Sequence, residues 1–264
     1  MMRGVNAVMP EHSTRIPLAL LIAMIATSPA FAAEIRVMSG GAPKEVLTQL
    51  IPRFEQATGH TVKLDYVLIA ALRERISKGE AAPDVAIMPT TAIAALAGEQ
   101  KLSGESMSRF GTLNLIAIAR DGAAVPNIST PEKFRDAFLA ARSIVYSTPT
   151  ATPSGAHMAQ VVAKLNIAAE VEKKVTYRPA LEGGAEMVAA GAAEIGVYPS
   201  SEVVHVKGVT QIGPLPEALQ LNLIYAGATH AQTQVAEPAL ALIRFLASDD
   251  NRKVWRDAGF GAAQ

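Results

Sequence analysis

The sequence predicts an α/β protein with two lobes, built on mostly parallel sheets with flanking helices and two crossing strands. Short apolar runs alternate along the chain with stretches of helical periodicity, a pattern typical of strands joined by helices. The alternation falls into two successive sets, and two strand-like passages, 112–119 and 219–226, connect them. Two lobes joined in this way leave a cleft between them, which is where we expect a ligand.

The first residues have the features of a secretory signal peptide. Arg3 and Arg15 precede the apolar run Leu18–Ala26, and the small-x-small sequence AFA ends at Ala32. The apolar run is too short to cross a bilayer as a helix. We therefore expect cleavage after Ala32, which removes residues 1–32 and leaves a soluble periplasmic protein. An uncleaved membrane anchor is the alternative.

The composition excludes several classes of function. The whole chain has 24 basic and 24 acidic residues, and loss of Arg3, Arg15 and Glu11 with the signal peptide leaves 22 and 23. This balance provides no basic excess for nucleic acid or an anionic membrane. The absence of cysteine excludes disulfides and thiolate metal sites. We expect no metal and no cofactor, because the histidines at 12, 60, 157, 205 and 230 never pair at helical spacing.

The first set opens with a strand, a glycine turn and a helix. Ser39, Gly40 and Gly41 interrupt the apolar run that starts at Ile35, and Pro43 suits the first turn of the following helix. The free N–H groups of that turn favour an anion, although a plain tight turn has the same pattern. Further strands are expected over 61–67, 84–88 and 112–119, and helices over 70–78 and 90–97.

The second set begins at Thr130, a good N-cap for a helix over 131–140. A strand at 143–147 then leads through a turn-rich loop, 148–155, into another helix. Further strands are expected over 175–177, 194–198 and 209–212, the last at an edge, and helices over 182–190, 235–247 and 251–258. Because the closing helices return to the first lobe, we assign that lobe residues 33–117 and 226–264 and the second lobe residues 118–225.

Four segments carry a family resemblance: IRVMSGGAPKEVLTQLIPRFEQATGHTV, ALRERISKGEAAPDVAIM, STPTATPSGAHMAQVVAKL and GGAEMVAAGAAEIGVYPSSEV. In their order and amino-acid sequence, these segments resemble the periplasmic solute-binding proteins of ABC transporters, type II fold, nearest the molybdate-binding branch. The resemblance covers nearly all of the mature chain. It implies a monomer without enzymatic activity, which closes its two lobes around a small anion and delivers it to a permease in the inner membrane.

The ligand site of the family transfers to this chain only in part. Molybdate binders carry a serine where this chain has Ala42, and a second hydroxyl donor is missing from the loop that ends at Ala70. Tyr198 matches the tyrosine of the second lobe, and Ser154 and Gly155 belong to a matching Pro-x-Gly loop. The loops after the expected parallel strands should converge on the cleft, because ligands bind outside the carboxyl ends of such strands. Together with the resemblance, these loops give an expected site of Ser39, Gly41, Ala42, Ala70, Arg73, Ser154, Gly155 and Tyr198.

The two alanines favour a ligand larger than molybdate, because they remove donors and leave room for carbon. Each buried oxygen left without a donor costs about 1–3 kcal/mol. Arg73, in the first turn of its helix, offers a planar fork of donors that matches a carboxylate. We therefore expect an organic acid held by Arg73, Tyr198 and the N–H groups around Gly41 and Ser154. A molybdate-like oxyanion is the alternative.

Two other functions stay open on the sequence. An exported α/β hydrolase needs a nucleophile beside a base, and Ser154 with His157 is the nearby pair. A sensory module of the same fold would report the ligand to a receptor. Turnover of generic esters distinguishes the first from a binding protein, and a neighbouring permease gene distinguishes the second.

Overall fold

The computed structural model describes residues 1, 4, 32–178 and 183–263. The predicted signal peptide therefore lies outside the described residues, apart from Met1, Gly4 and Ala32. The chain divides into a unit of residues Met1–Phe31 and a unit of residues Ala32–Gln264, and the described helices and strands all belong to the second. None of the helices in the described part is long and apolar enough to cross a membrane.

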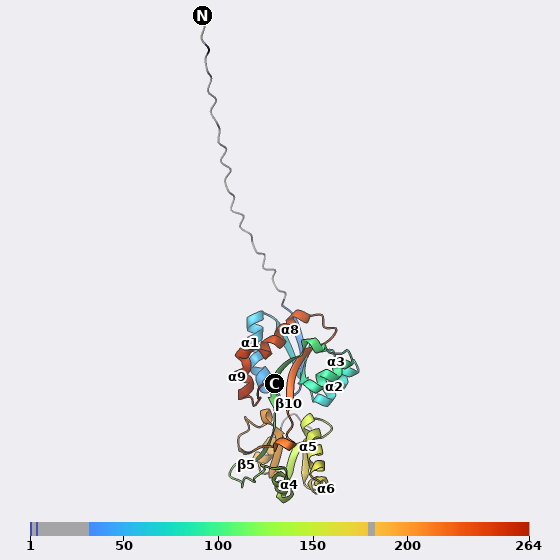
Figure 1. The fold of residues 1–264 in the computed structure, drawn as a ribbon, viewed down its shortest axis with the longest axis vertical. Helices are drawn as coiled ribbons and strands as arrows, with labels where there is room; N and C mark the ends of the chain where they lie inside the picture. The colour runs from blue at the N-terminus through green and yellow to red at the C-terminus, as the bar shows by residue number, and fades with distance from the viewer. Residues whose placement is uncertain (2–3, 5–31, 179–182, 264) are drawn as a thin grey trace. The chain divides into compact units, whose positions relative to one another are not determined.

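The first lobe is built on a five-stranded mixed sheet of order β2-β1-β3-β10-β4. β1 pairs in parallel with β2 and β3, whereas β10 runs antiparallel to β3 and β4. The strands are β1 Glu34–Ser39, β2 Thr61–Tyr66, β3 Val85–Pro89, β4 Ser108–Leu113 and β10 Leu223–Thr229. The helices are α1 Lys44–Thr58, α2 Ile69–Ser77, α3 Thr90–Gly98, η1 Gly104–Ser106, α8 Ala236–Ala247, η4 Asp249–Asn251 and α9 Arg252–Asp257. In Figure 1, β10 runs between α1, α8 and α9 on one side and α2 and α3 on the other.

Helices cover both faces of this sheet because its central strands are apolar on both sides. Val37 of β1 packs with α1, α8 and α9 on one face, and its neighbour Met38 packs with α2 and α3 on the other. Successive side chains of a strand point to opposite faces, which explains the division. The sheet thus fixes the position of α1.

The second lobe repeats this plan with a five-stranded sheet of order β7-β6-β8-β5-β9. β6 pairs in parallel with β7 and β8, and β5 runs antiparallel to β8 and β9. The strands are β5 Leu115–Arg120, β6 Ile144–Ser147, β7 Val175–Arg178, β8 Ile195–Pro199 and β9 Val209–Pro214. The helices are α4 Pro131–Ala140, α5 Pro153–Lys164, α6 Ala168–Glu172, α7 Gly184–Ala189, η2 Ser200–Glu202 and η3 Glu217–Leu219.

The core of the second lobe also lies on both faces of its sheet. Tyr146 packs with α4, α5 and α6, whereas its neighbour Val145 packs against α7 on the other face. Thr130 and Thr152 cap α4 and α5 by accepting hydrogen bonds from Lys133 N and Gly155 N. The predicted cap at Thr130 and the predicted edge position of β9 are confirmed.

The chain passes between the sheets at two places. The sequence predicted one strand over 112–119, but the structure divides it at Asn114, because Leu113 pairs with β10 and Leu115 pairs with β8. The return passage runs through residues 220–222 into β10. The Gln220 side chain links the two passages: its Oε1 accepts from Leu115 N at 2.8 Å and its Nε2 donates to Leu115 O at 3.2 Å.

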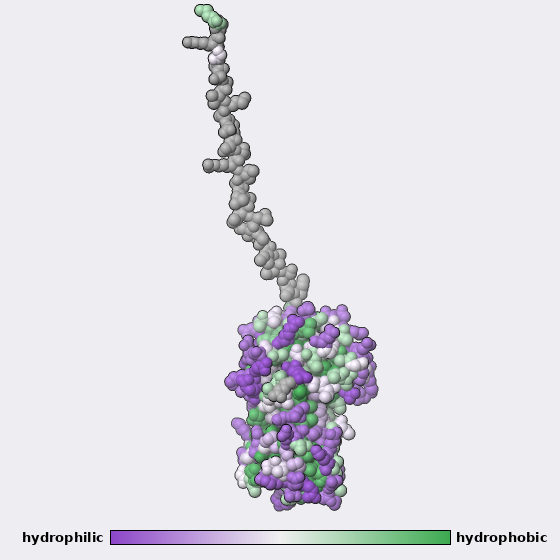
Figure 2. Space-filling model, viewed as in Figure 1, coloured by the Kyte–Doolittle hydropathy of each residue, from purple (hydrophilic) through white to green (hydrophobic). Residues whose placement is uncertain are grey.

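The sheets are mixed rather than mostly parallel, and the crossings explain the difference. Each lobe has three parallel strands from its own βα units, and the antiparallel pairs all involve β5 or β10, the strands that follow the crossings. Hydrophilic residues cover much of the visible face of the folded unit (Figure 2). Among the described residues after Ala32, the exposed large hydrophobic side chains are Val125 and Val204.

Candidate ligand-binding site

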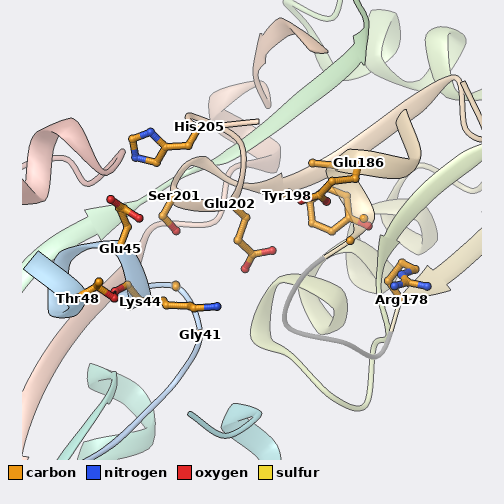
Figure 3. Close-up of a pocket in the computed structure, with 14 residues that line it drawn as sticks. Gly41, Lys44, Glu45, Thr48, Arg178, Glu186, Tyr198, Ser201, Glu202 and His205 are labelled. Atoms are coloured by element: carbon orange, nitrogen blue, oxygen red, sulfur yellow. The ribbon is translucent and has the colours of Figure 1, made fainter. Parts of the chain in front are cut away.

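A cavity of about 390 Å³ is lined by residues of both lobes (Figure 3). The first lobe contributes the turn before α1 and the first turns of that helix. The second lobe contributes the end of β7, the start of α7, the end of β8 and the segment that follows it. The lining residues are Gly41, Ala42, Lys44, Glu45, Thr48, Arg178, Gly183, Gly184, Ala185, Glu186, Tyr198, Ser201, Glu202 and His205.

Three residues that line this cavity each have a buried polar atom without a hydrogen-bond partner: Arg178 Nε, Tyr198 Oη and Ser201 Oγ. A buried polar group without a partner costs about 1–3 kcal/mol, so native proteins keep few of them. Among the described side chains, these are the buried unpartnered atoms, and all of them belong to residues that line one cavity. Each can donate a hydrogen bond. The cavity is therefore suited to a ligand rich in acceptor oxygens.

A glycine pair makes room for two of these side chains. Gly184 begins α7 against the phenol of Tyr198, and a β-carbon at this position would overlap Tyr198 Oη. Gly183 has φ +96°, and a β-carbon there would lie 2.8 Å from Arg178 Nη2. Any larger residue at either position would displace the tyrosine or the arginine. The Gly-Gly pair of the sequence thus positions both donors.

Tyr198 reaches the cavity from a buried strand, β8, where it pairs with Ile116 of β5. Burial raises the pKa of its phenol above the ordinary value, and the nearby carboxylate of Glu202 adds to the increase. The group therefore stays protonated at neutral pH and acts as a donor. Tyr225, on the first-lobe side, is also buried and has a raised pKa for the same reasons.

The segment after β8 is held against the first lobe. Ser200 N donates to Asn114 O at 2.9 Å, and Ser200 Oγ donates to Gly259 O at 2.6 Å. These bonds fix η2, which carries Ser201 and Glu202 into the cavity. η2 itself has no side-chain cap.

A smaller cavity of about 30 Å³ adjoins the same loops. This is enough room for a water molecule, which needs roughly 10–15 Å³ of such space. It is lined by Gly41, Ala42, Leu68, Ile69, Ser147, Thr152, Pro153, Ser154, Pro199, Glu202, Leu223 and Tyr225. Three residues, Gly41, Ala42 and Glu202, line both cavities.

The structure brings half of the predicted site residues to these cavities. Gly41 and Ala42 line both, Tyr198 lines the larger and Ser154 lines the smaller. Ser39 is fully buried and donates to Gly40 O at 2.8 Å. Gly41, Ala42, Ser154 and Tyr198 lie at the ends of strands or in the segments that follow them, where ligands bind in α/β sheets.

The other predicted residues lie elsewhere. Gly155 packs against the backbone of Ser147 and Thr148. Ala70 and Arg73 are exposed on α2 and line neither cavity. The charged donor that the structure provides in the larger cavity is Arg178.

The hydrolase pair considered on the sequence is not assembled. Ser154 Oγ shares a hydrogen bond of 3.1 Å with Thr152 Oγ1, and His157 Nε2 lies 2.8 Å from Leu219 O. His157 therefore stabilises the segment before β10 and lines neither cavity.

Sequence reasoning missed Lys44, Arg178, Ser201 and Glu202. A signal was present for three of them, because Arg178 ends a strand and Ser201 and Glu202 follow one. The residues that follow the carboxyl ends of parallel strands face the cleft in such sheets. Lys44 carries no comparable signal, since it is one polar residue in the first turn of an amphipathic helix.

The charges that line the larger cavity are mixed. Lys44 and Arg178 are cationic, and Glu45, Glu186 and Glu202 are anionic. Glu45 and Glu186 are exposed, so water screens them, whereas Glu202 is half-buried. Within the described ranges, no group of His, Cys, Asp or Glu is arranged to hold a metal ion.

Comparisons with known proteins give one family and one fold. The model of the family described as "Bacterial extracellular solute-binding protein" matches residues 35–261. The chain is 30% identical over 258 residues to an aconitate isomerase of Pseudomonas sp, covering 93% of this chain and 96% of that protein.

Two solved structures are similar in fold. One is the periplasmic molybdate-binding protein of Azotobacter vinelandii, with a TM-score of 0.70, 17% identity, and coverage of 87% of this chain and 100% of that chain. The other is the substrate-binding domain of a putative molybdenum ABC transporter from Clostridium difficile, with a TM-score of 0.70, 16% identity, and coverage of 88% and 100%. Both confirm the two-lobed α/β fold that the sequence predicts.

Proposed function

Because the chain belongs to the bacterial extracellular solute-binding proteins, matched over residues 35–261, we propose that it binds a small organic polycarboxylate in the larger cavity. The family implies, in general terms, an exported protein with a small ligand and a permease partner. The observation that carries the ligand proposal is that Arg178 Nε, Tyr198 Oη and Ser201 Oγ are all unpartnered and belong to residues that line one cavity. Cleavage after Ala32 stays a prediction.

The size and chemistry of the cavity favour an organic acid over a tetrahedral oxyanion. A volume of about 390 Å³ lies in the range of roughly 300–1,000 Å³ that is usual for sites of small organic molecules. A guanidinium matches the two oxygens of a carboxylate, and two hydroxyl donors suit further carboxylate oxygens. The relative named aconitate isomerase supports the same class, because aconitate is an unsaturated tricarboxylic acid.

Arg178 takes the role that the sequence analysis gave to Arg73. Arg178 ends β7 and lines the cavity, whereas Arg73 lies in the middle of α2 and is exposed outside it. Lys44 supplies a second positive charge from the first lobe, and Figure 3 shows its side chain directed into the cavity. A ligand held by Lys44 and Arg178 would join the two lobes.

Lobe closure is part of the proposal. The chain passes between the two sheets at Asn114 and at residues 220–222, close to the limits of the lobes proposed from the sequence, 33–117 with 226–264 and 118–225. Only these two short passages need to change their backbone angles for one lobe to rotate on the other. The Gln220 amide, bonded to Leu115, would keep the two passages moving together.

Calorimetric titration tests the proposed function. We expect tricarboxylates, namely cis-aconitate, trans-aconitate and citrate, to bind more tightly than molybdate, tungstate, sulfate or phosphate. Arg178→Ala removes a charged hydrogen bond worth about 1.5–3 kcal/mol and should weaken binding about 10- to 150-fold. The matched control Arg73→Ala should leave the affinity unchanged. Tight molybdate binding by both variants, with no carboxylate binding, would refute the proposal.

A second candidate function is isomerisation of the bound acid. The specific observation in its favour is the 30% identity to an aconitate isomerase over nearly the full length of both chains. A binding protein returns its ligand unchanged, whereas an isomerase converts cis-aconitate to trans-aconitate or the reverse. Incubation of either isomer with the protein, followed by proton NMR, distinguishes the two.

A further inference from the structure

Glu202 is the feature of the cavity that anion binding alone does not explain. It is half-buried at the end of η2 and lines both the larger and the smaller cavity. In Figure 3 its carboxylate points into the same space as the Lys44 side chain. A carboxylate at this place repels the carboxylates of the proposed ligand.

The surroundings of Glu202 are suited to proton transfer. Tyr198 and Tyr225 lie close enough for its charge to raise the pKa of both phenols, after the larger effect of burial. Both phenols therefore stay protonated at neutral pH and act as donors. This leaves the carboxylate as the group among the three that can accept a proton from a ligand.

The other two acids of the cavity are less suited to this role. Glu45 and Glu186 are exposed and line the larger cavity alone. Among the carboxylates in the described part of the chain, Glu202 is the one that lines both cavities.

Resting on the proposed polycarboxylate site, we infer that Glu202 moves a proton between two carbon atoms of a bound unsaturated tricarboxylate and so isomerises it. The carboxylate takes a proton from the methylene carbon that lies between a ligand carboxylate and the double bond. The electron pair of the broken C–H bond forms a new double bond to the central carbon. The pair of the old double bond moves to the other terminal carbon, which takes the proton back from Glu202.

This step balances without an oxidant or a reductant, since the same proton and the same electrons are redistributed. Negative charge accumulates on the ligand carboxylates next to the reacting carbons while the proton is on Glu202. Arg178, Tyr198 and Ser201 line the same cavity, and their unpartnered donors would stabilise that charge. The donors that explain binding thus also favour the reaction.

The experiment measures binding and isomerisation separately on the purified full chain. Calorimetry gives the affinity for cis- and trans-aconitate, and proton NMR follows their interconversion. Glu202→Gln keeps the shape and removes the base, so it should slow isomerisation about 10²- to 10⁴-fold, the usual contribution of a general base. Its affinity should stay within about tenfold of the wild type or increase, because the substitution removes a repelling charge.

Glu170→Gln is the control, since it neutralises an exposed carboxylate on α6, outside both cavities, and should keep the wild-type rate. Glu202→Asp is the second variant and should fold, retain binding and turn over slowly, because its carboxylate is displaced by one methylene group. If Glu202→Gln fails to fold, the Asp variant and the control decide the question.

The outcomes separate the two proposals. Absence of binding to any tricarboxylate would refute the proposed function. Tight binding by the wild type without interconversion would overturn the role of Glu202 and leave the binding proposal intact. Interconversion at the wild-type rate by Glu202→Gln or Glu202→Asp would show that another group moves the proton.

Discussion

Replacing Tyr198 by phenylalanine should stabilise the ligand-free protein and weaken ligand binding. Tyr198 is 3% exposed and its hydroxyl has no partner, so the hydroxyl destabilises the free protein. Relief of an unpartnered buried polar group amounts to about 1–3 kcal/mol, and we expect the lower end, because water can enter the cavity. For a chain of this size, about 1 kcal/mol corresponds to a rise of about 2–4 °C in the melting temperature.

The same substitution should weaken ligand binding, although it stabilises the ligand-free protein. Loss of a hydrogen bond to a charged oxygen costs about 1.5–3 kcal/mol, which weakens binding about 10- to 150-fold. The assay combines thermal unfolding of the free protein with calorimetric titration of trans-aconitate.

Tyr146→Phe is the matched control. Tyr146 is 1% exposed, on β6 of the same sheet, and its hydroxyl is hydrogen-bonded with Tyr177. Removing this partnered hydroxyl should destabilise the protein and leave the affinity unchanged. The reasoning would be refuted if Tyr198→Phe lowered the melting temperature as Tyr146→Phe does, since that would mean that the Tyr198 hydroxyl already has a partner.

Two further predictions concern the scaffold. Gly184→Ala should displace the phenol that lies against it, lowering stability by about 1–3 kcal/mol and weakening tricarboxylate binding, and normal affinity in a titration would contradict this. Asp84 is buried, and burial alone raises the pKa of its carboxyl group. The carboxylate accepts hydrogen bonds from Arg36 N at 2.8 Å, from the Arg36 guanidinium and from Thr233 Oγ1 at 2.7 Å. These hydrogen bonds outweigh the effect of burial, so the pKa of Asp84 is lowered. This stabilisation is fully present above the ordinary pKa of 3.8 and is lost as the pH falls through the lowered folded-state pKa. Asp84→Asn should therefore lower the free energy of unfolding, measured in urea, by about 1–3 kcal/mol at pH 7 and by less below about pH 4. A loss of unfolding free energy that does not depend on pH would contradict the assignment.

Hydrophobic periodicity was sufficient to predict the fold class. The apolar positions assigned to the buried face of α1, from Val46 to Phe54, are buried, because a helix at a sheet edge has one face to cover. Strand β4 was harder to recognise. Its start at Ser108 lacks an apolar alternation, and Gly111 in its middle packs closely against Phe260, which is remote in sequence.

The site could be predicted at its loops but not at its side chains. Ligands bind outside the carboxyl ends of parallel strands, and this tendency, with the family resemblance, led to Gly41 and Tyr198, which line the larger cavity. The charged donor was assigned to Arg73, because helical periodicity does not say whether a polar position faces a cleft or open solvent. Arg178 reaches the cavity through the parallel register that places it opposite Ser147, and pairing of this kind is a tertiary property.

A crystal structure of the protein with trans-aconitate tests the central claim most directly. We predict that the acid occupies the larger cavity, with carboxylate oxygens within hydrogen-bond distance of Arg178 Nε, Tyr198 Oη and Ser201 Oγ. The Glu202 carboxylate should face a carbon of the ligand rather than an oxygen. A ligand bound elsewhere, with the three donors still unpartnered, would contradict the account.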